Sequence, residues 1–261
     1  METIDVSRAD AGIVTITLNR PEKKNAINAP MWNELLTTFR EIGANPGVDR
    51  VVIVTGAGGA FCSGADLSSG LSVSGRQRNQ LFDMRHVADV CLALHRLPQP
   101  VIAKVGGVAA GAGANLAFGC DLIVASDEAR FTEIFARRGL TIDAGGSWLL
   151  PRLIGLHRAK ELALFADIIS AKEAEAFGLV NRVVPAGELD AFVDDWATKL
   201  AAGPPIALAQ TMALLNNSFQ VTLEQALEDE GRAQTVNGAT ADTAEALKAF
   251  LEKRPPQFEG R

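Results

Sequence analysis

The sequence predicts a mixed α/β core over residues 1–200, followed by a helical region over residues 201–261. A phrase of apolar strand, glycine-rich turn and helix recurs along the first part of the chain. After residue 201 only helical patterning remains, rich in Ala, Leu and Glu. With 261 residues, 48% of them hydrophobic and 21% charged, the chain has the composition of a globular protein with a large core.

The strands and the first helix of the core follow from local patterns. The alternating run GIVTITL (residues 12–18) predicts a half-buried strand. Residues 28–42 predict an amphipathic helix, because Asn28 is a capping residue and Pro30 falls in the first turn. Short apolar runs predict three strands that are covered on both faces: VVIV (51–54), VIAKV (101–105) and LIVA (122–125).

Two further segments complete the organisation of the chain. Residues 68–76 are rich in Ser and Gly, and we expect them to be mobile. Gly203-Pro204-Pro205 marks the start of the helical region, which we expect to pack on the core or on a neighbouring subunit. Between these segments lies a helical stretch with one face made by Leu81, Met84, Ala88, Cys91 and His95.

Composition excludes several classes of protein. A net charge of −6 argues against a general nucleic-acid binder, because phosphate contacts need a basic face. No apolar run approaches the roughly 20 residues that cross a bilayer, and the start METIDVSRAD has no apolar leader, so we expect a cytoplasmic protein. Cys62, Cys91 and Cys120 form no CxxC or Cys/His spacing, which indicates free thiols and no metal site.

Two glycine-rich turns are the most informative features of the sequence. GAGGAFCSGADL (residues 56–67) and GGVAAGAG (residues 106–113) each follow a predicted strand. A dinucleotide-binding pattern fails, because Phe61 stands where a glycine is needed. Each turn alone is equally consistent with close packing between a strand and a helix. Together they offer two sets of free N–H groups, which a developing thioester enolate needs.

These turns resemble the two signature stretches of the crotonase (enoyl-CoA hydratase/isomerase) superfamily. The likeness continues through RPEKKNAIN (20–28), GLTIDAGGSWLLP (139–151) and AEAFGLVNRV (174–183). The resemblance implies a spiral of repeated ββα units and an acyl-CoA thioester substrate, with no cofactor besides the substrate's own coenzyme A. It further implies a homotrimer or a dimer of trimers with C-terminal helices at the subunit contacts.

The resemblance also assigns roles to residues of both turns. The N–H groups of Ala65 and Ala112 correspond to the oxyanion hole, although the family commonly has glycine at the position of Ala112. Asp66 corresponds to a residue that we expect to hold the loop and the CoA-contacting backbone. The substrate-binding set implied by the resemblance is Lys24, Ala26, Ser63, Gly64, Asp66, Leu67, Gly111, Asn115 and Phe135.

The family's hydratases use two glutamates, and in this chain Asn115 and Phe135 stand at those positions. Asp143 lies in the loop that the family brings against the acyl chain. A partly desolvated carboxylate there would have a raised pKa and would be a better base for a C–H proton. The run from residue 139 to 155 is particularly similar to the ring-epoxide isomerases of phenylacetyl-CoA degradation, so the sequence predicts an isomerase with Asp143 as proton shuttle.

Several alternatives stay open at the level of sequence. Asp143 could instead cap the helix that starts near Gly146. Glu133 could be a substitute base, or a solvated or salt-bridged surface residue. His86 could line the acyl pocket or face solvent. A hydratase, an aryl-CoA dehalogenase with a nucleophilic aspartate, and a non-catalytic acyl-CoA-binding protein are the competing functions.

Overall fold

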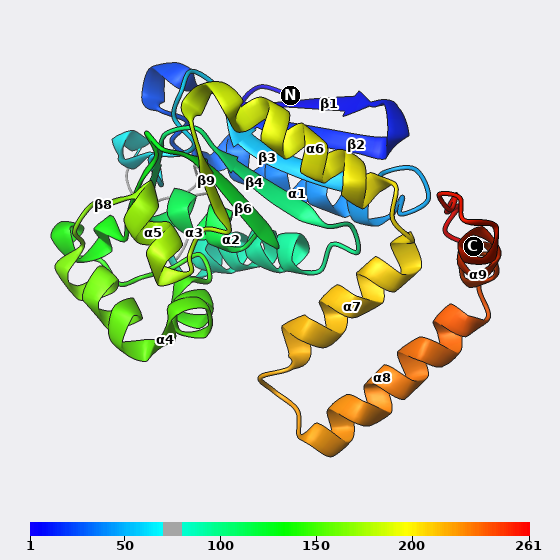
Figure 1. The fold of residues 1–261 in the computed structure, drawn as a ribbon. Helices are drawn as coiled ribbons and strands as arrows, with labels where there is room; N and C mark the ends of the chain where they lie inside the picture. The colour runs from blue at the N-terminus through cyan, green and yellow to red at the C-terminus, as the bar shows by residue number, and fades with distance from the viewer. Residues whose placement is uncertain (70–79) are drawn as a thin grey trace.

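The computed structural model describes residues 1–69 and 80–261 as two β-sheets with surrounding helices (Figure 1). Most of the Ser- and Gly-rich segment that we expected to be mobile lies outside the described residues. No helix in the described ranges is long and apolar enough to cross a membrane.

The larger sheet has six strands in the order β1-β2-β3-β4-β6-β9. β1 pairs antiparallel with β2, and the other neighbouring strands pair in parallel. All four strands predicted from the sequence lie in this sheet. Its strands are β1 (Ile4–Ala9), β2 (Ile13–Leu18), β3 (Val51–Gly56), β4 (Val101–Val105), β6 (Leu122–Ser126) and β9 (Arg182–Val184).

The smaller sheet explains the spiral. It contains β5 (Val108–Ala110), β7 (Arg130–Thr132) and β8 (Ile169–Ser170) in that order. After β4 and again after β6, the chain adds one short strand to this sheet before it forms a helix. After β3 that short strand is reduced to a single bridge between Cys62 and Ala109. The repeated ββα unit confirms the predicted crotonase-like fold.

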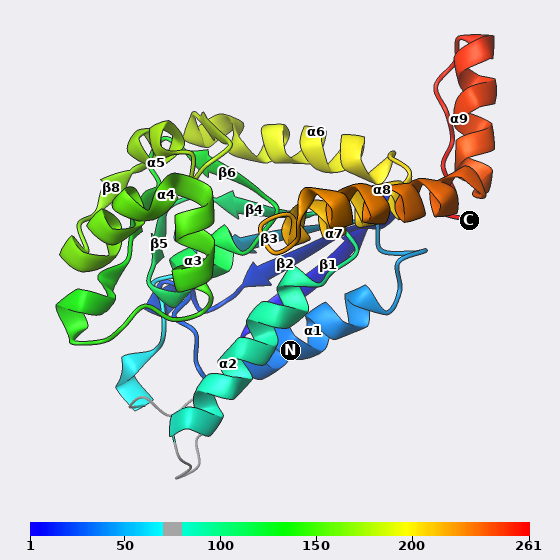
Figure 2. The same ribbon diagram turned by 90° about the horizontal axis from the view of Figure 1, so that it is seen from below.

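Helices cover both faces of the larger sheet. Side chains alternate along each strand, so Val52 and Val54 of β3 enter the main core under α1 and α2, whereas Val51 and Ile53 pack against α6. Figure 2 shows the sheet with α6 on one side and α1 and α2 on the other. The bounds of these helices are α1 (Ala29–Gly43), α2 (Gln80–His95) and α6 (Leu189–Ala201).

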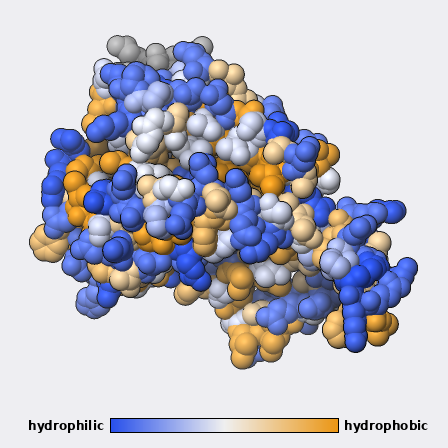
Figure 3. Space-filling model, turned by 45° about the horizontal axis from the view of Figure 1, so that its top comes forward, coloured by the Kyte–Doolittle hydropathy of each residue, from blue (hydrophilic) through white to orange (hydrophobic). Residues whose placement is uncertain are grey.

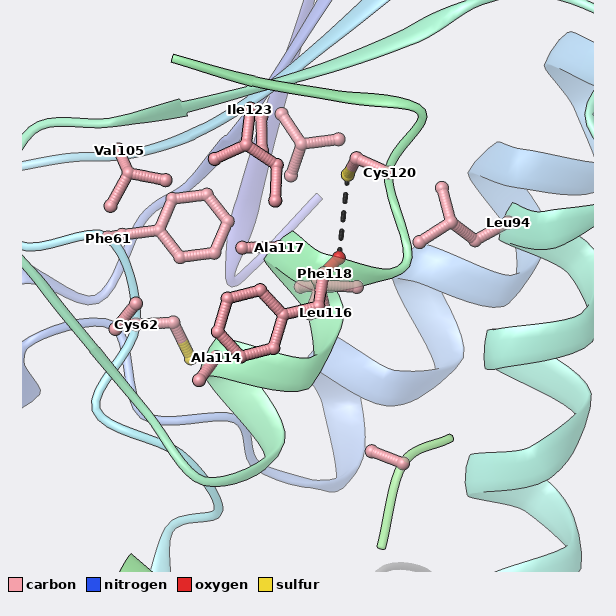
Figure 4. Packing of buried hydrophobic residues seen from close by; sticks show 14 of the residues in the cluster. Phe61, Cys62, Leu94, Val105, Ala114, Leu116, Ala117, Phe118, Cys120 and Ile123 are labelled. Atoms are coloured by element: carbon pink, nitrogen blue, oxygen red, sulfur yellow. Dashed lines mark hydrogen bonds between the residues drawn. The ribbon is translucent and has the colours of Figure 1, made fainter. Parts of the chain in front are cut away.

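Small residues bring the short helix α3 (Ala112–Phe118) against the turn that follows β3. Phe61 and Cys62 of that turn lie beside Ala114 and Ala117 of α3 (Figure 4). A Cβ atom on Gly113 would lie 2.5 Å from both the carbonyl oxygen and the Sγ atom of Cys62, so only glycine fits. This contact places the two glycine-rich turns next to each other.

The C-terminal helices α7 (Pro205–Asn217), α8 (Leu223–Gly238) and α9 (Ala241–Glu252) project from the body (Figures 1 and 2). The described chain after residue 201 contains no strand, in agreement with the sequence pattern. Hydrophobic residues gather along the lower edge of this projection in Figure 3. Its large apolar side chains that are more than half exposed are Leu215, Phe219, Leu223, Leu227, Val236, Leu247, Phe250 and Leu251.

Arg50 connects this projection to the body. Its guanidinium donates hydrogen bonds to the carbonyl oxygens of Ala201 (3.3 Å), Gly203 (3.0 Å) and Phe258 (3.2 Å). These bonds hold the end of α6 and the chain terminus to the loop that precedes β3.

We expect Arg50→Ala to lower the free energy of unfolding by about 1.5–3 kcal/mol, because it removes hydrogen bonds from a charged donor. Amide hydrogen exchange in α7, α8 and α9 should become faster, and urea unfolding with exchange mass spectrometry measures both effects. Arg40→Ala, on the exposed side of α1, is the matched control and should change stability by less than about 0.5 kcal/mol. Unaltered exchange in the C-terminal helices of Arg50→Ala would contradict this account.

Candidate active site

The two glycine-rich turns meet where β3 and β5 end. The N–H of Cys62 donates to the carbonyl of Val108, and the N–H of Ala110 donates to the carbonyl of Cys62, both at 2.9 Å. Gly64 has φ +99°, and a Cβ atom there would lie 2.9 Å from the carbonyl oxygen of Ala110 and 3.9 Å from the nitrogen of Ala112. Glycine therefore lets one turn approach the first residue of α3 backbone to backbone.

Both N–H groups expected to form the oxyanion hole lack a protein acceptor within the described ranges. Ala112 begins α3, so its N–H is among the first four of a helix, which have no intrahelical partner. The N–H of Ala65 has no acceptor either, because the residues on both sides of it form the hydrogen bonds with Ile27. The N–H of Ile27 donates to the carbonyl of Gly64, and the N–H of Asp66 donates to the carbonyl of Ile27, both at 2.8 Å. Two free donors thus lie on adjoining turns.

Arg20 and Asp66 fix the loop that carries Ala65. Arg20 donates to a carboxylate oxygen of Asp66 at 2.8 Å and to the carbonyl of Ala26 at 2.6 Å. The second oxygen of Asp66 accepts from the hydroxyl (2.6 Å) and the N–H (3.0 Å) of Ser68. These bonds from Ser68, with the one from Arg20, lower the pKa of Asp66 to about 2. The carboxylate is therefore ionised at neutral pH, and both of its oxygens accept hydrogen bonds that hold the loop.

Asn25 joins the neighbouring loop to the same turn, a role that the sequence analysis missed. Its side chain is fully buried and donates to the carbonyls of Ala57 (2.8 Å) and Ala60 (2.9 Å). Lys24 precedes it with an exposed side chain, and its carbonyl accepts from the N–H of Ser63 at 2.9 Å. Asparagine tolerates the left-handed φ of 56° that this tight loop requires, which is the one signal that could have indicated it.

A cavity of about 700 Å³ opens between α2, α3, α7 and α4 (Gly146–Phe165). The predicted face of α2 supplies Ala88, Cys91 and His95 to its wall, and the ring of His95 lies edge-on to Trp148, with 5.3 Å between the ring centroids. His86 is not among the residues of this wall, so the alternative in which it lines the acyl pocket is not supported. The rest of the wall is mostly apolar.

The predicted binding residues divide between this cavity and the loops beside it. Ala112 and Asn115 line the cavity, whereas Ala65 lies on the adjoining loop. Phe135 is buried behind Gly111, where a Cβ atom would lie 3.5 Å from its ring. Leu67, 49% exposed, faces outward from its loop. The positions of Asn115 and Phe135 therefore bring an amide and a phenyl ring to the site, but no carboxylate.

Asp143 lies at the edge of the cavity, whose wall includes the next two residues, Ala144 and Gly145. Its Oδ1 atom is buried without a hydrogen-bond partner among the described residues, and burial raises its pKa to about 6. The N-cap of α4 is Gly145, and no side chain from residues 1–69 or 80–261 caps this helix. The interpretation of Asp143 as a helix cap is therefore wrong.

Glu133 is buried, with 2% of its surface exposed, so its interpretation as a surface residue is wrong. The side chain of Asn115 donates to one carboxyl oxygen of Glu133 at 3.3 Å and to the backbone carbonyl of Asp143 at 2.9 Å. Burial raises the pKa of Glu133 to about 8; the hydrogen bond from Asn115 opposes this shift, and the charge of Asp143 adds to it. The site thus combines two carboxyl groups with different pKa values, an arrangement suited to proton transfer.

Known proteins resemble this chain over nearly its whole length, including every residue of the site described above. A family profile described as enoyl-CoA hydratase/isomerase matches residues 8–261. The chain is 41% identical to a probable enoyl-CoA hydratase of Rhodobacter capsulatus, over 96% of this chain and 95% of the relative. It is 37% identical to the 1,2-epoxyphenylacetyl-CoA isomerase of Escherichia coli, over 98% of each chain. The crystal structure of an enoyl-CoA hydratase from Bacillus anthracis matches with a TM-score of 0.93 and 36% identity, over 99% of this chain and 100% of that structure.

Gly146 provides a test of how the Asp143 loop is held. A Cβ atom at this position would lie 2.4–2.7 Å from three side-chain atoms of Asn115. We expect Gly146→Ala to destabilise the protein by about 1–3 kcal/mol through overpacking, measured by urea unfolding. The double variant Gly146→Ala with Asn115→Ala makes room for the new methyl group and should be more stable than the sum of the two single changes implies. Strict additivity would show that the two residues are not in contact.

Proposed function

We propose that this chain, which belongs to the enoyl-CoA hydratase/isomerase family, is an isomerase of acyl-CoA thioesters. It would shift a double bond or convert a ring isomer, with Asp143 as proton shuttle. One observation carries the proposal: the site has an unpartnered carboxyl group on Asp143 but lacks carboxylates at the two positions where hydratases have glutamates. Asp143 offers a buried, unpartnered carboxyl oxygen beside an apolar cavity, and the positions of Asn115 and Phe135 offer no carboxylate.

The proposed step moves one proton and balances without a further reactant. The Asp143 carboxylate takes a proton from C2 of a 3-enoyl thioester, and the electron pair passes through the thioester group to its oxygen. The resulting dienolate oxygen accepts hydrogen bonds from the N–H groups of Ala65 and Ala112. Asp143 then returns the proton to C4, and the double bond comes to lie between C2 and C3. A raised pKa suits Asp143 to both halves of this exchange.

The CoA portion of the substrate belongs, in this proposal, on the loops outside the cavity. Asp66 and Asn25 hold two loops together, and the exposed side chain of Lys24 extends from one of them. The other expected CoA-binding residues on these loops are Ala26, Ser63, Gly64 and Leu67. Backbone groups and a single cation can bind a phosphorylated ligand in this way. The acyl group would then extend past Ala112 into the cavity.

A hydratase is the competing function, since one relative is named a probable enoyl-CoA hydratase. Hydration needs groups that activate a water molecule and protonate the neighbouring carbon, and a buried Glu133 near Asp143 could supply a second carboxyl. The relative named 1,2-epoxyphenylacetyl-CoA isomerase favours isomerisation and an aromatic acyl group. A non-catalytic acyl-CoA-binding protein would keep the loops and the cavity without turnover.

We also propose a homotrimer, or a dimer of trimers, that buries the apolar side chains of α7, α8 and α9. Phe219, Phe250 and Leu251 are at least 70% exposed in the single chain. Large apolar side chains that are exposed on one projection of the chain are typical of a protein interface. A second copy of the chain would remove it from water.

We expect Asp143→Asn to lower kcat on 3-enoyl-CoA about 100-fold or more, because the amide cannot accept the proton. Turnover in deuterated water, followed by mass spectrometry, measures the exchange of label. In the unmodified protein the rate should rise with pH through about 6, because only the ionised form of Asp143 is a base. Asp121→Asn is a matched control, since Asp121 also has a pKa raised to about 6, but its carboxylate accepts a hydrogen bond from the N–H of Val101 and does not line the cavity.

A gain in mass by one water would instead identify a hydratase. Unchanged turnover in Asp143→Asn would remove Asp143 from the mechanism. Binding of acyl-CoA without any turnover of 2-enoyl, 3-enoyl or phenylacetyl-epoxide thioesters would support the non-catalytic alternative.

A further inference from the structure

We propose that Glu133 is a positioning residue for Asp143: its side chain, bound through the carboxamide of Asn115, holds the loop that carries Asp143 in place. This inference rests on the proposed function, because it explains how the proton shuttle is aimed. It concerns a residue two positions away from the second glutamate position of the hydratases, which is occupied here by Phe135.

The carboxamide of Asn115 is the centre of the arrangement. Its nitrogen has two hydrogens, and they face two acceptors: the carbonyl of Asp143 at 2.9 Å and a carboxyl oxygen of Glu133 at 3.3 Å. The opposite orientation would turn the Asn115 oxygen toward the Asp143 carbonyl, and two acceptors would then face each other. Both acceptors therefore determine which way the amide points.

The loop around Asp143 depends on that amide. Asn115 is 1% exposed and packs so tightly on the loop that Gly146 has no room for a side chain. Ala144 has a φ of 48° in the left-handed region, which is unfavourable for a residue with a side chain. The hydrogen bond from Asn115 and the bond from the N–H of Gly146 (3.0 Å) both reach the carbonyl of Asp143 and hold this conformation.

Glu133 can perform this role as a neutral acid, because no cation reaches it within the described part of the chain. It forms no salt bridge, and its second carboxyl oxygen is buried without a partner. α3 and β5 contain no ionisable side chain, and the loop before α4 contributes the charge of Asp143. Arg152 lies over the ring of Trp148, and the other charged or titratable side chains on β7, on η4 (Ile134–Arg138) and on α4 are exposed: Arg130, Arg137, Arg138, His157, Arg158, Lys160 and Glu161.

The protonation of Glu133 then controls Asp143. Below its pKa of about 8, Glu133 is neutral and accepts from Asn115 without opposing the charge of Asp143. Above that pH a second buried anion would repel the carboxylate and the developing dienolate. It would also draw Asn115 away from the Asp143 carbonyl, because an ionised acceptor binds the amide more strongly. Activity should therefore fall on the alkaline side of neutrality.

The first experiment detects the proton directly and does not depend on turnover. Difference infrared spectroscopy of the whole protein should show the C=O stretch of a carboxylic acid that disappears as the pH rises through about 8. The two aspartates with raised pKa values, Asp121 and Asp143, titrate near 6 and do not interfere. The band should be absent from Glu133→Gln. A protein without this band at pH 7 overturns the inference, whatever reaction the enzyme catalyses.

The second experiment compares two variants in the deuterium-exchange assay. Glu133→Gln keeps an oxygen that accepts from Asn115, so it should retain activity within about tenfold at pH 7 and lose the decline above pH 8. Glu133→Leu removes the acceptor and should lower kcat by at least about tenfold more than Glu133→Gln, with a smaller change in KM. Equal loss in both variants, or an alkaline decline that persists in Glu133→Gln, overturns the positioning role.

The two experiments separate this inference from the proposed function. If no thioester is isomerised but the infrared band behaves as stated, the proposed function fails while the neutral, buried Glu133 stands. If isomerisation proceeds through Asp143 but Glu133→Leu behaves like Glu133→Gln, the proposed function stands and the positioning role fails.

Discussion

The close approach of two backbone turns is the constraint on which the rest of this structure depends. Gly64 and Gly113 have no Cβ atom, so the turn after β3 can lie directly against Ala110 and the start of α3. A methyl group at either position would meet backbone atoms within 3 Å. Because the contact is made by backbone, it leaves the N–H groups of Ala65 and Ala112 free on adjoining turns. A site built in this way needs few functional side chains of its own.

The polar part of the site is organised around a buried amide. Asn115 joins the Asp143 loop to Glu133, and three oxygen atoms of these residues stay buried without a hydrogen-bond partner in the described chain. A buried polar atom without a partner costs free energy, so such a cluster survives where a ligand or a proton completes it. The cluster therefore contributes less to the free energy of folding than an apolar core would, and its unpartnered oxygen atoms are available to a ligand or a proton.

The body of the protein and its C-terminal helices have different structural roles. Apolar strands covered by helices on both faces give a rigid frame, and the loops at the strand ends carry the polar groups. The C-terminal helices add α7 to the cavity wall but leave large apolar side chains in contact with water. The single chain therefore forms this cavity on its own but presents a surface that is suited to association.

Some features were determined by the sequence alone. Residues 51–54, 101–105 and 122–125 could be identified as buried strands because a strand covered on both faces must be apolar throughout. The two glycine turns, the Asn28 cap of α1 and the helical end were equally visible, since each depends on a local pattern. β1 was not predicted, because it is an edge strand whose side chains are mostly exposed and polar. β5, β7 and β8 are too short to show a period.

Tertiary structure alone decided the state of the ionisable groups. The local sequence allowed Glu133 to face solvent, but in the folded chain it is buried and bound by Asn115 of α3. The same packing leaves Asp143 unpartnered where local sequence allowed a helix cap, and brings His95 rather than His86 to the cavity. Short-range patterns record backbone preference and hydrophobicity. A pKa, however, depends on every group that surrounds a side chain, and those groups come together only when the chain has folded.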